Sequence, residues 1–309
     1  MLKSLHHVKF KVKDLEALKV FAKDFGLIPL EETAERVVMR ALGGDTGVYV
    51  AEKADEDAFT GLAFEVDSRS DLDTAVNTLG ATGVADLDLP CGGQYVTLTD
   101  PDGNEVILVH GVSRVAEGAL EPELIINTPT KKLRFGQNQI NRNVGPARLW
   151  RIGHIGLFVR DFAASSAWYQ EKFGLIGSDV YNIPGQPDNK IVGFFRMNKG
   201  EEYVDHHVVA LMQDQRGGCH HISFEVQDFE AQCTTHRYLE SMNYESIWGV
   251  GRHPHGSHVF DVWRSPDGAR FETFSDTDLF REVDGTNYHD ISTVDMDKWS
   301  SEPPDKYFI

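Results

Sequence analysis

Apolar and polar residues alternate in two segments of similar sequence, 153–159 (GHIGLFV) and 220–226 (HHISFEV). A strand has a side-chain period of two, so the apolar residues of each segment would pack on one face of a sheet. His154 and His221 fall at the opposite parity and would point to the other face. The pattern therefore predicts two strands that each present one histidine away from the core.

These strands belong to an internal repeat, which pairs 5–14 with 152–161, 61–67 with 221–227, and 100–107 with 265–272. Helix-like stretches follow the first pair, at 15–24 and 162–172, and both stop at a Phe-Gly-Leu signal. Glycine is the expected residue just past a helix C-terminus. The repeat therefore predicts two strand-helix-strand-strand-strand modules in each half, four in all, and an α+β fold.

The repeat also sets the expected domain boundaries. Residues 1–112 form an N-terminal domain, 113–149 a connecting segment, and 150–283 a C-terminal domain. The connecting segment is turn-rich and contains three prolines, which suggests little core of its own. Residues 284–309 form a tail with enough aromatic residues to dock somewhere. It could cover the mouth of a site or make a subunit contact, and both alternatives stay open.

A metal site is the strongest chemical prediction. A third candidate strand, 270–274, follows the turn signal Ser-Pro-Asp-Gly and carries Glu272. With His154 and His221, Glu272 completes a set of two histidines and one carboxylate. Such a set holds one face of an octahedral ion and leaves the other face open, as in non-haem Fe(II) oxygenases.

The first half lacks this set. The positions that align with the three candidate ligands are His7, Gly61 and Ile107. Glycine and isoleucine offer no side-chain ligand, so the N-terminal domain is expected to bind no metal. The comparison separates scaffold from site, because the first half shows that the fold does not require the ligand set.

The composition of the chain excludes some classes of binding partner. The 309 residues carry a formal charge of −18, which argues against nucleic acid or an anionic membrane surface as partner. No apolar run is long enough to span a bilayer, and we expect no signal peptide. Three cysteines, Cys91, Cys219 and Cys233, give no disulfide framework, which fits a reducing cytoplasm.

The segments 206–211 (HHVVAL), 219–224 (CHHISF) and 251–272 together resemble the type I extradiol ring-cleaving dioxygenases of the vicinal oxygen chelate superfamily, similar to catechol 2,3-dioxygenases. The resemblance covers nearly the whole chain. It implies that the four modules pair into two vicinal-oxygen-chelate domains, with mixed curved sheets forming an open barrel around the metal in the C-terminal one. It also implies that His154, His221 and Glu272 bind Fe(II), or Mn(II) in some members.

The resemblance assigns further residues. His207 matches the acid–base histidine of the family, and His253 matches one that bonds substrate or closes the pocket. Val262 stands where the family usually has a tyrosine, so one hydrogen bond to the substrate is expected to be missing. His258 shares the strand parity of Val262 and could replace that bond in part, but a plain surface histidine is the expected role. His206, His220 and His255 are expected around the site or on the surface.

The expected activity is cleavage of a small aromatic diol by O₂ beside its two hydroxyls, in the degradation of aromatic compounds. Family members are commonly homo-oligomers, and the same is expected here. Two alternatives remain: a metal-dependent isomerase or lyase built on the same modules, and a non-catalytic protein that binds a metal or an aromatic ligand. Lost ligands in the first half count against the isomerase, and Val262 gives weight to the binding protein.

Overall fold

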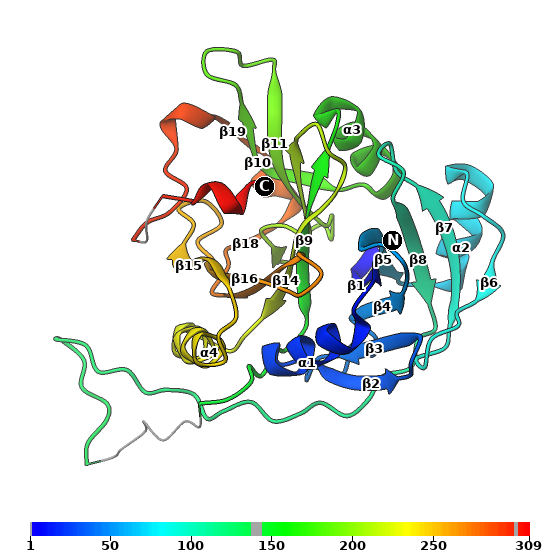
Figure 1. Cartoon of the computed structure of the whole chain (residues 1–309). Coiled ribbons are helices and arrows are strands. Elements are labelled where there is room, and N and C mark those ends of the chain that lie inside the picture. Colours follow the sequence, from blue (N-terminus) through cyan, green and yellow to red (C-terminus); the bar gives the residue numbers. More distant parts are fainter. Residues whose placement is uncertain (1, 137–143, 300–301) are drawn as a thin grey trace.

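The computed structural model describes residues 2–136, 144–299 and 302–309. Two large sheets dominate it, one from each half of the chain, and they stand side by side (Figure 1). The first half contains β1 (Leu2–Val12), α1 (Leu15–Phe25), β2 (Ile28–Glu32), β3 (Arg36–Arg40), β4 (Tyr49–Lys53), β5 (Ala58–Val66), α2 (Arg69–Thr74) with a π-helical turn η1 (Ala75–Leu79), β6 (Ala85–Asp86), β7 (Gln94–Thr99) and β8 (Glu105–His110).

The second half repeats this order with additions. It contains β9 (Ile152–Val159), α3 (Phe162–Phe173), β10 (Ile176–Asn182), β11 (Lys190–Arg196), β12 (Val204–Asp205), β13 (Val209–Gln213), β14 (Gly218–Glu225), α4 (Phe229–Ser241), β15 (Ser246–Arg252), β16 (Val259–Arg264), β17 (Arg270–Ser275), β18 (Leu279–Phe280), β19 (Asn287–Asp290) and the 3₁₀ turns η2 (Glu282–Asp284), η3 (Ile291–Thr293) and η4 (Asp305–Tyr307). Apart from β12, β18 and β19, this gives the four predicted modules, and the α+β class is confirmed.

Strand order follows the repeat. The first sheet runs β2-β3-β4-β1-β5-β8-β7-β6, and the second runs β15-β16-β17-β14-β9-β13-β11-β10-β19. Both sheets mix parallel and antiparallel neighbours; β9, for example, pairs with β14 antiparallel and with β13 parallel. Each module contributes its four strands to one side of its sheet, with β1 and β5, or β9 and β14, meeting in the middle.

Local sequence explains the two matching helices. Asp14 and Asp161 cap α1 and α3, since their carboxylates accept hydrogen bonds from the amides of Ala17 and Ala164. Both helices end at a glycine in the left-handed region, with φ of 117° at Gly26 and 68° at Gly174. The predicted stop signals are therefore confirmed, because glycine adopts this conformation without a steric penalty.

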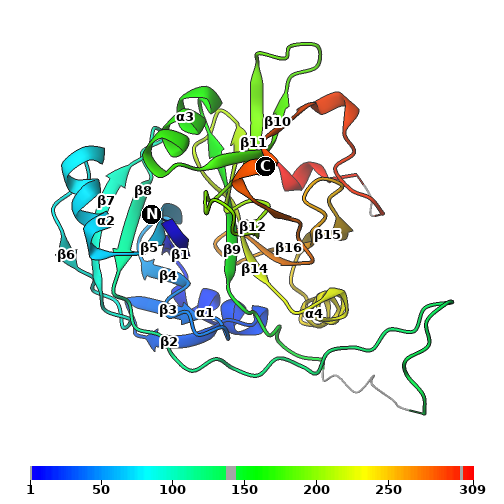
Figure 2. The same ribbon diagram turned by 180° about the vertical axis from the view of Figure 1, so that it is seen from behind.

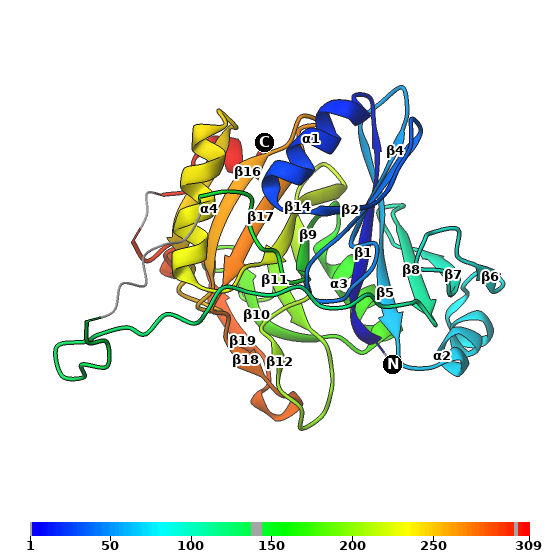
Figure 3. The same cartoon turned by 90° about the horizontal axis from the view of Figure 1, so that it is seen from below.

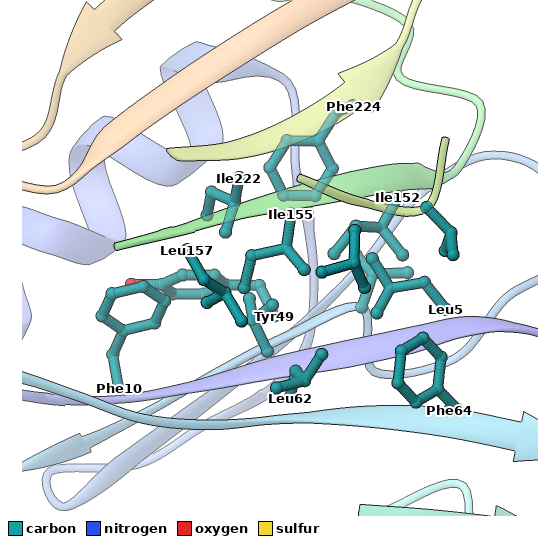
Figure 4. Close-up of a cluster of buried hydrophobic side chains, with 14 of the residues drawn as sticks. Leu5, Phe10, Tyr49, Leu62, Phe64, Ile152, Ile155, Leu157, Ile222 and Phe224 are labelled. Atoms are coloured by element: carbon teal, nitrogen blue, oxygen red, sulfur yellow. The ribbon is translucent and has the colours of Figure 1, made fainter. Parts of the chain in front are cut away.

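The apolar faces of the central strands meet in one core between the two sheets. Ile155 and Leu157 of β9 face the side chains of Leu5 and Leu62 from β1 and β5, and Phe224 of β14 joins them (Figure 4). All are buried. The residues of β9 and β14 that lie between these apolar ones therefore point away from the first half, as the period-two pattern predicts.

Helices also bind each half to the other. Helix α1 contacts α4, and the two lie next to each other when the molecule is seen from below (Figure 3). Helix α3 packs on β11 and β13 (Figure 2), and its Tyr169 hydroxyl donates to Asp100 of the first half at 3.1 Å. One helix of each half thus reaches the other half.

Phe21 on α1 provides a test of this packing. Its ring contacts those of Tyr244 and Phe271 at centroid distances of 5.0 and 5.1 Å. Replacing Phe21 with alanine is expected to lower the free energy of unfolding by about 3–5 kcal/mol, the usual cost of removing a buried ring. Urea denaturation measures it. Val20→Ala on the exposed face of α1 is the control, with an expected change within about 0.5 kcal/mol; equal effects of the two variants would contradict the shared core.

Outside 137–143, residues 112–151 contain neither helix nor strand in the described part of the chain. The segment 284–309 was predicted to be a tail outside the domains. Part of it instead belongs to the second sheet, because β19 pairs in parallel with β10 and forms the edge of that sheet. The domain boundaries themselves stay predictions. No helix among the described residues is long and apolar enough to cross a membrane.

Candidate metal centre

The three predicted ligands come from adjacent strands at the middle of the second sheet, in the order β9, β14 and β17. His154 on β9 lies opposite Ser223 of β14, and Ser223 in turn lies opposite Glu272 of β17. His221 lies opposite Gly156. All three ligand side chains are buried and line one cavity of about 300 Å³ on the face of the sheet away from the inter-sheet core.

His154 and Glu272 approach each other in a way that suits a cation between them. His154 Nε2 lies 3.2 Å from Glu272 Oε1 and has no hydrogen-bond partner among the described residues. Burial lowers the pKa of His154 to about 3, so its imidazole is neutral at pH 7. His154 Nε2 and Glu272 Oε1 are thus two buried atoms with lone pairs that face each other without a well-formed hydrogen bond between them. A metal ion bound between them would satisfy both.

His221 is oriented by its neighbour. The two Nδ1 atoms of His220 and His221 lie 2.7 Å apart, and His220 Nε2 lies 2.8 Å from the backbone oxygen of Tyr307. A carbonyl only accepts, so His220 carries its proton on Nε2 and accepts at Nδ1 from His221. Burial also lowers the pKa of His221 to about 3. A neutral His221 with its proton on Nδ1 leaves Nε2 bare, as a ligand must be.

Glu272 is also held from outside. The Ser223 hydroxyl donates a 2.6 Å hydrogen bond to Glu272 Oε1, and both side chains are buried. Hydrogen bonds from surrounding groups fix the orientation of metal ligands and tune their basicity. His154 and Glu272 thus bring ligand atoms close to each other, and His221 lines the same cavity. Among the described residues, the group of ligand atoms within 4.8 Å of one another contains His154, Glu272 and His258 but not His221, so the predicted ligand set stays a prediction.

The first half has the same strand register as the second but lacks an equivalent set of ligands. Val8 lies opposite Leu62 and Lys9 opposite Gly61, while Ala63 lies opposite Ile107, so the register is that of the second sheet. A Cβ at Gly61 would lie 2.4 Å from the backbone oxygen of Glu105, so a histidine does not fit there without a shift. Ala63, Ile107 and Val109 fill the equivalent face with an apolar cluster. The aligned positions of the two halves therefore correspond in space.

His207, the predicted acid–base residue, lies against the candidate ligands, with its ring centroid 4.1 Å from that of His154. Its Nδ1 is 3.0 Å from Nδ1 of His206, and His206 Nε2 is 2.5 Å from Asp179 Oδ2. Bonds from His206 and His289 lower the pKa of Asp179 to about 2 despite burial of the carboxyl, so it is an anionic acceptor. Asp179 therefore anchors His206, and His206 orients His207.

His253 lines the same cavity. Its Nδ1 lies 2.7 Å from the backbone oxygen of Met296, and its ring stacks on Phe260 with centroids 4.2 Å apart. Burial lowers the pKa of His253. The proton of the neutral ring therefore resides on Nδ1, and Nε2 is left as an acceptor.

His258 differs from the expectation of a surface residue. Only 2% of it is exposed, and neither ring nitrogen has a hydrogen-bond partner among the described residues. One of its nitrogens, one of His154 and an oxygen of Glu272 all lie within 4.8 Å of one another. The expectation was wrong because the His258 ring packs against the rings of His154, His207 and Phe274, with centroids 5.5, 5.5 and 6.1 Å away. The parity that His258 shares with Val262 was the signal in the sequence.

The C-terminal segment closes one side of the cavity. Figure 1 shows it in red near β10 and β15, and its Ile291, Val294, Met296 and Tyr307 line the cavity. Tyr307 packs in one cluster with Val262 and Phe260. Of the two roles left open for this segment, covering the site is the one that these contacts support.

Tyr307 offers a test of this closure. Tyr307→Ala removes a buried ring that contacts His220, and we expect it to cost about 3–5 kcal/mol of unfolding free energy and to raise KM. Tyr307→Phe keeps the ring and is expected to retain most of the stability. Thermal denaturation and initial-rate kinetics measure both effects. Ile309→Ala, at an exposed position in the same segment, is the control; a Tyr307→Ala variant that behaves like it would exclude a closing role.

Comparisons with known proteins agree with this fold. The model of the Glyoxalase/Bleomycin resistance protein/Dioxygenase superfamily matches residues 4–108 and 151–273, together more than half of the chain. Metapyrocatechase 2 of Cupriavidus necator is 24% identical over 320 residues, covering 99% of this chain and 91% of the relative.

Two solved structures illustrate the likeness of the folds. The Mn(II)-bound glyoxalase from Novosphingobium aromaticivorans has a TM-score of 0.81 and 22% identity, and the match covers 99% of this chain and 93% of that one. Homoprotocatechuate 2,3-dioxygenase from Arthrobacter globiformis has a TM-score of 0.79 and 17% identity, with 100% and 91% covered. At these identities the two structures establish a shared fold.

Proposed function

The chain belongs to the Glyoxalase/Bleomycin resistance protein/Dioxygenase superfamily, and from this we propose that it is an extradiol ring-cleaving dioxygenase that acts on a small aromatic diol with O₂. One observation carries the proposal: His154, His221 and Glu272 line a cavity that is also lined by the two predicted histidines, His207 and His253. The match to a metapyrocatechase along nearly the whole chain supports it.

We propose His154, His221 and Glu272 as the ligands of a divalent cation, Fe(II) or Mn(II). Two neutral imidazoles and one carboxylate fit this class of ion, and they leave part of its charge to be neutralised by an anionic substrate. A bound ion of this kind would lower the pKa of a diol hydroxyl and mediate electron transfer from the diol to O₂.

The surrounding residues have roles that follow from their protonation. His207 accepts the phenolic proton at Nε2, because its Nδ1–H is directed to His206, and it can return that proton during ring opening. His253 accepts a hydrogen bond from the substrate at Nε2. Phe194, Val192 and Ala210 line the cavity and exclude water around the aromatic ring.

The test is oxygen consumption by anaerobically Fe(II)-loaded protein with a panel of substituted catechols, together with absorbance of the ring-opened product. Uptake of oxygen with a yellow semialdehyde-type product is the expected result. Tight metal binding without uptake for any catechol would contradict the proposal.

A metal-dependent isomerase or lyase is the second candidate. The additional imidazole of His258 beside His154 and Glu272 favours it, because it would give the ion a fuller set of protein ligands. Oxygen uptake separates the two, since only the dioxygenase consumes O₂. A homo-oligomer in the cytoplasm and a role in the degradation of aromatic compounds stay predictions.

A further inference from the structure

His258 is a buried imidazole for which neither the fold nor the proposed acid–base chemistry supplies a partner. It lies directly before β16, and its backbone oxygen accepts a 3.1 Å hydrogen bond from the amide of His253. Both ring nitrogens lack a partner among the described residues. Leaving a buried polar group without a hydrogen bond is unfavourable, so an unpaired imidazole at this place calls for a ligand.

The surroundings of His258 consist mainly of other acceptors. Its ring centroid lies 5.5 Å from those of His154 and His207 and 4.8 Å from that of His253. Glu272 adds a carboxylate, and one ligand atom each from His258, His154 and Glu272 lie within 4.8 Å of one another. A cation would satisfy this surplus of lone pairs.

His258 also differs from His221, His207 and His253 in how it is held. His221 is bonded to His220, His207 to His206, and His253 to the Met296 carbonyl. A hydrogen bond to the second ring nitrogen fixes a ligating histidine and strengthens its basicity. His258 has none, so it can reach a metal ion but is held there less firmly than His221.

We propose that His258 is a fourth, exchangeable metal ligand of the substrate-free site, which leaves when an aromatic diol chelates the ion. The inference rests on the proposed function in one respect, namely that His154, His221 and Glu272 bind the ion. Three protein ligands leave three places on an octahedral ion, and His258 takes one of them. A chelating diol needs two places and O₂ a third, so the dioxygenase reaction requires that His258 leave.

The experiment counts imidazole ligands with Mn(II) as the probe. Pulsed electron paramagnetic resonance resolves the ¹⁴N couplings of coordinated imidazoles. The full chain is expected to show three imidazole nitrogens without substrate and two after catechol is added in the absence of oxygen. His258→Ala is expected to show two in both states, and to bind Mn(II) at least about 10-fold more weakly, the effect of losing even an outer partner of a ligand.

His7→Ala is the control, because it removes a buried imidazole whose Nε2 also lacks a partner among the described residues, at the first-half position that aligns with His154. Its Mn(II) affinity and nitrogen count are expected to equal those of the unmodified protein. If His258→Ala does not fold, as judged by thermal denaturation, His258→Asn takes its place with the same expected losses.

Two imidazoles in the unmodified protein before catechol is added, or an unchanged Mn(II) affinity in the variant, would overturn the proposal. Three imidazoles that persist in the presence of catechol would overturn the exchange and favour the isomerase. Oxygen uptake is measured separately on the Fe(II) form. Failure of the dioxygenase activity therefore shows itself independently of the ligand count.

Discussion

Glu272→Ala is expected to abolish both metal binding and oxygen uptake. Glu272 is the only carboxylate among the three proposed ligands, and it is buried with a Ser223 hydrogen bond that fixes one oxygen. Removing it leaves neutral imidazoles, which cannot offset the ion's charge. We expect the Kd for Mn(II) or Fe(II) to rise by more than about 100-fold, since loss of even an outer partner of a ligand costs about 10–100-fold. Calorimetric titration and metal analysis after dialysis measure it.

Ile107→Ala is the matched control, because Ile107 lies at the position of Glu272 in the first half. It belongs to an apolar cluster, so the substitution is expected to lower the unfolding free energy by about 2–5 kcal/mol and leave metal affinity unchanged. The two equivalent positions should thus give opposite signatures. Retention of metal and of oxygen uptake by Glu272→Ala would rule out the proposed ligand set.

His207→Ala is expected to lower kcat by about 10²–10⁴-fold with metal content unchanged, which is the usual range for loss of a general acid–base group. His207 lies next to His154 but is not among the proposed ligands, and its Nδ1 is occupied by His206. Steady-state oxygen uptake gives kcat, and metal analysis of the same sample separates chemistry from metal loss.

His110→Asn is the control for His207, because His110 is a half-buried histidine of β8 in the first half that bonds to the Val66 carbonyl outside the cavity. Its kcat is expected to match that of the unmodified protein. If His207→Ala keeps kcat but loses metal, His207 is a ligand and not an acid–base group. If it changes neither quantity, both roles are excluded.

Much of the fold was predictable from local signals. Alternation in 153–159 and 220–226 gave the two central strands and the faces of their histidines, because side chains of a strand alternate by geometry alone. Gly26 and Gly174 marked the helix ends. The repeat then supplied the register between distant strands, and the structure places His7, Gly61 and Ile107 at the positions aligned with the ligands.

Other parts of the site depend on contacts between distant segments that carry no local signal. Asp179 of β10 meets His206, 27 residues later, and His289 of β19, 110 residues later. The sequence contains three His-His doublets, and in the structure the two Nδ1 atoms of each doublet lie within 3.0 Å of each other. The partner that anchors the His206 doublet could not be read from them.

The sequence by itself determined the modules and the duplicated register and predicted His154, His221 and Glu272 as a ligand set, since strand periodicity and repetition are properties of short segments. Only the tertiary structure decided that described parts of the C-terminal segment return to the second sheet, with β19 at its edge and Tyr307 against Val262. The tertiary structure also buries His258 beside the candidate ligand His154, with the two ring centroids 5.5 Å apart. The physical reason for the return of the C-terminal segment is the burial of apolar side chains from segments far apart in the chain. This burial depends on the assembled surface and not on the hydrophobic pattern of either segment.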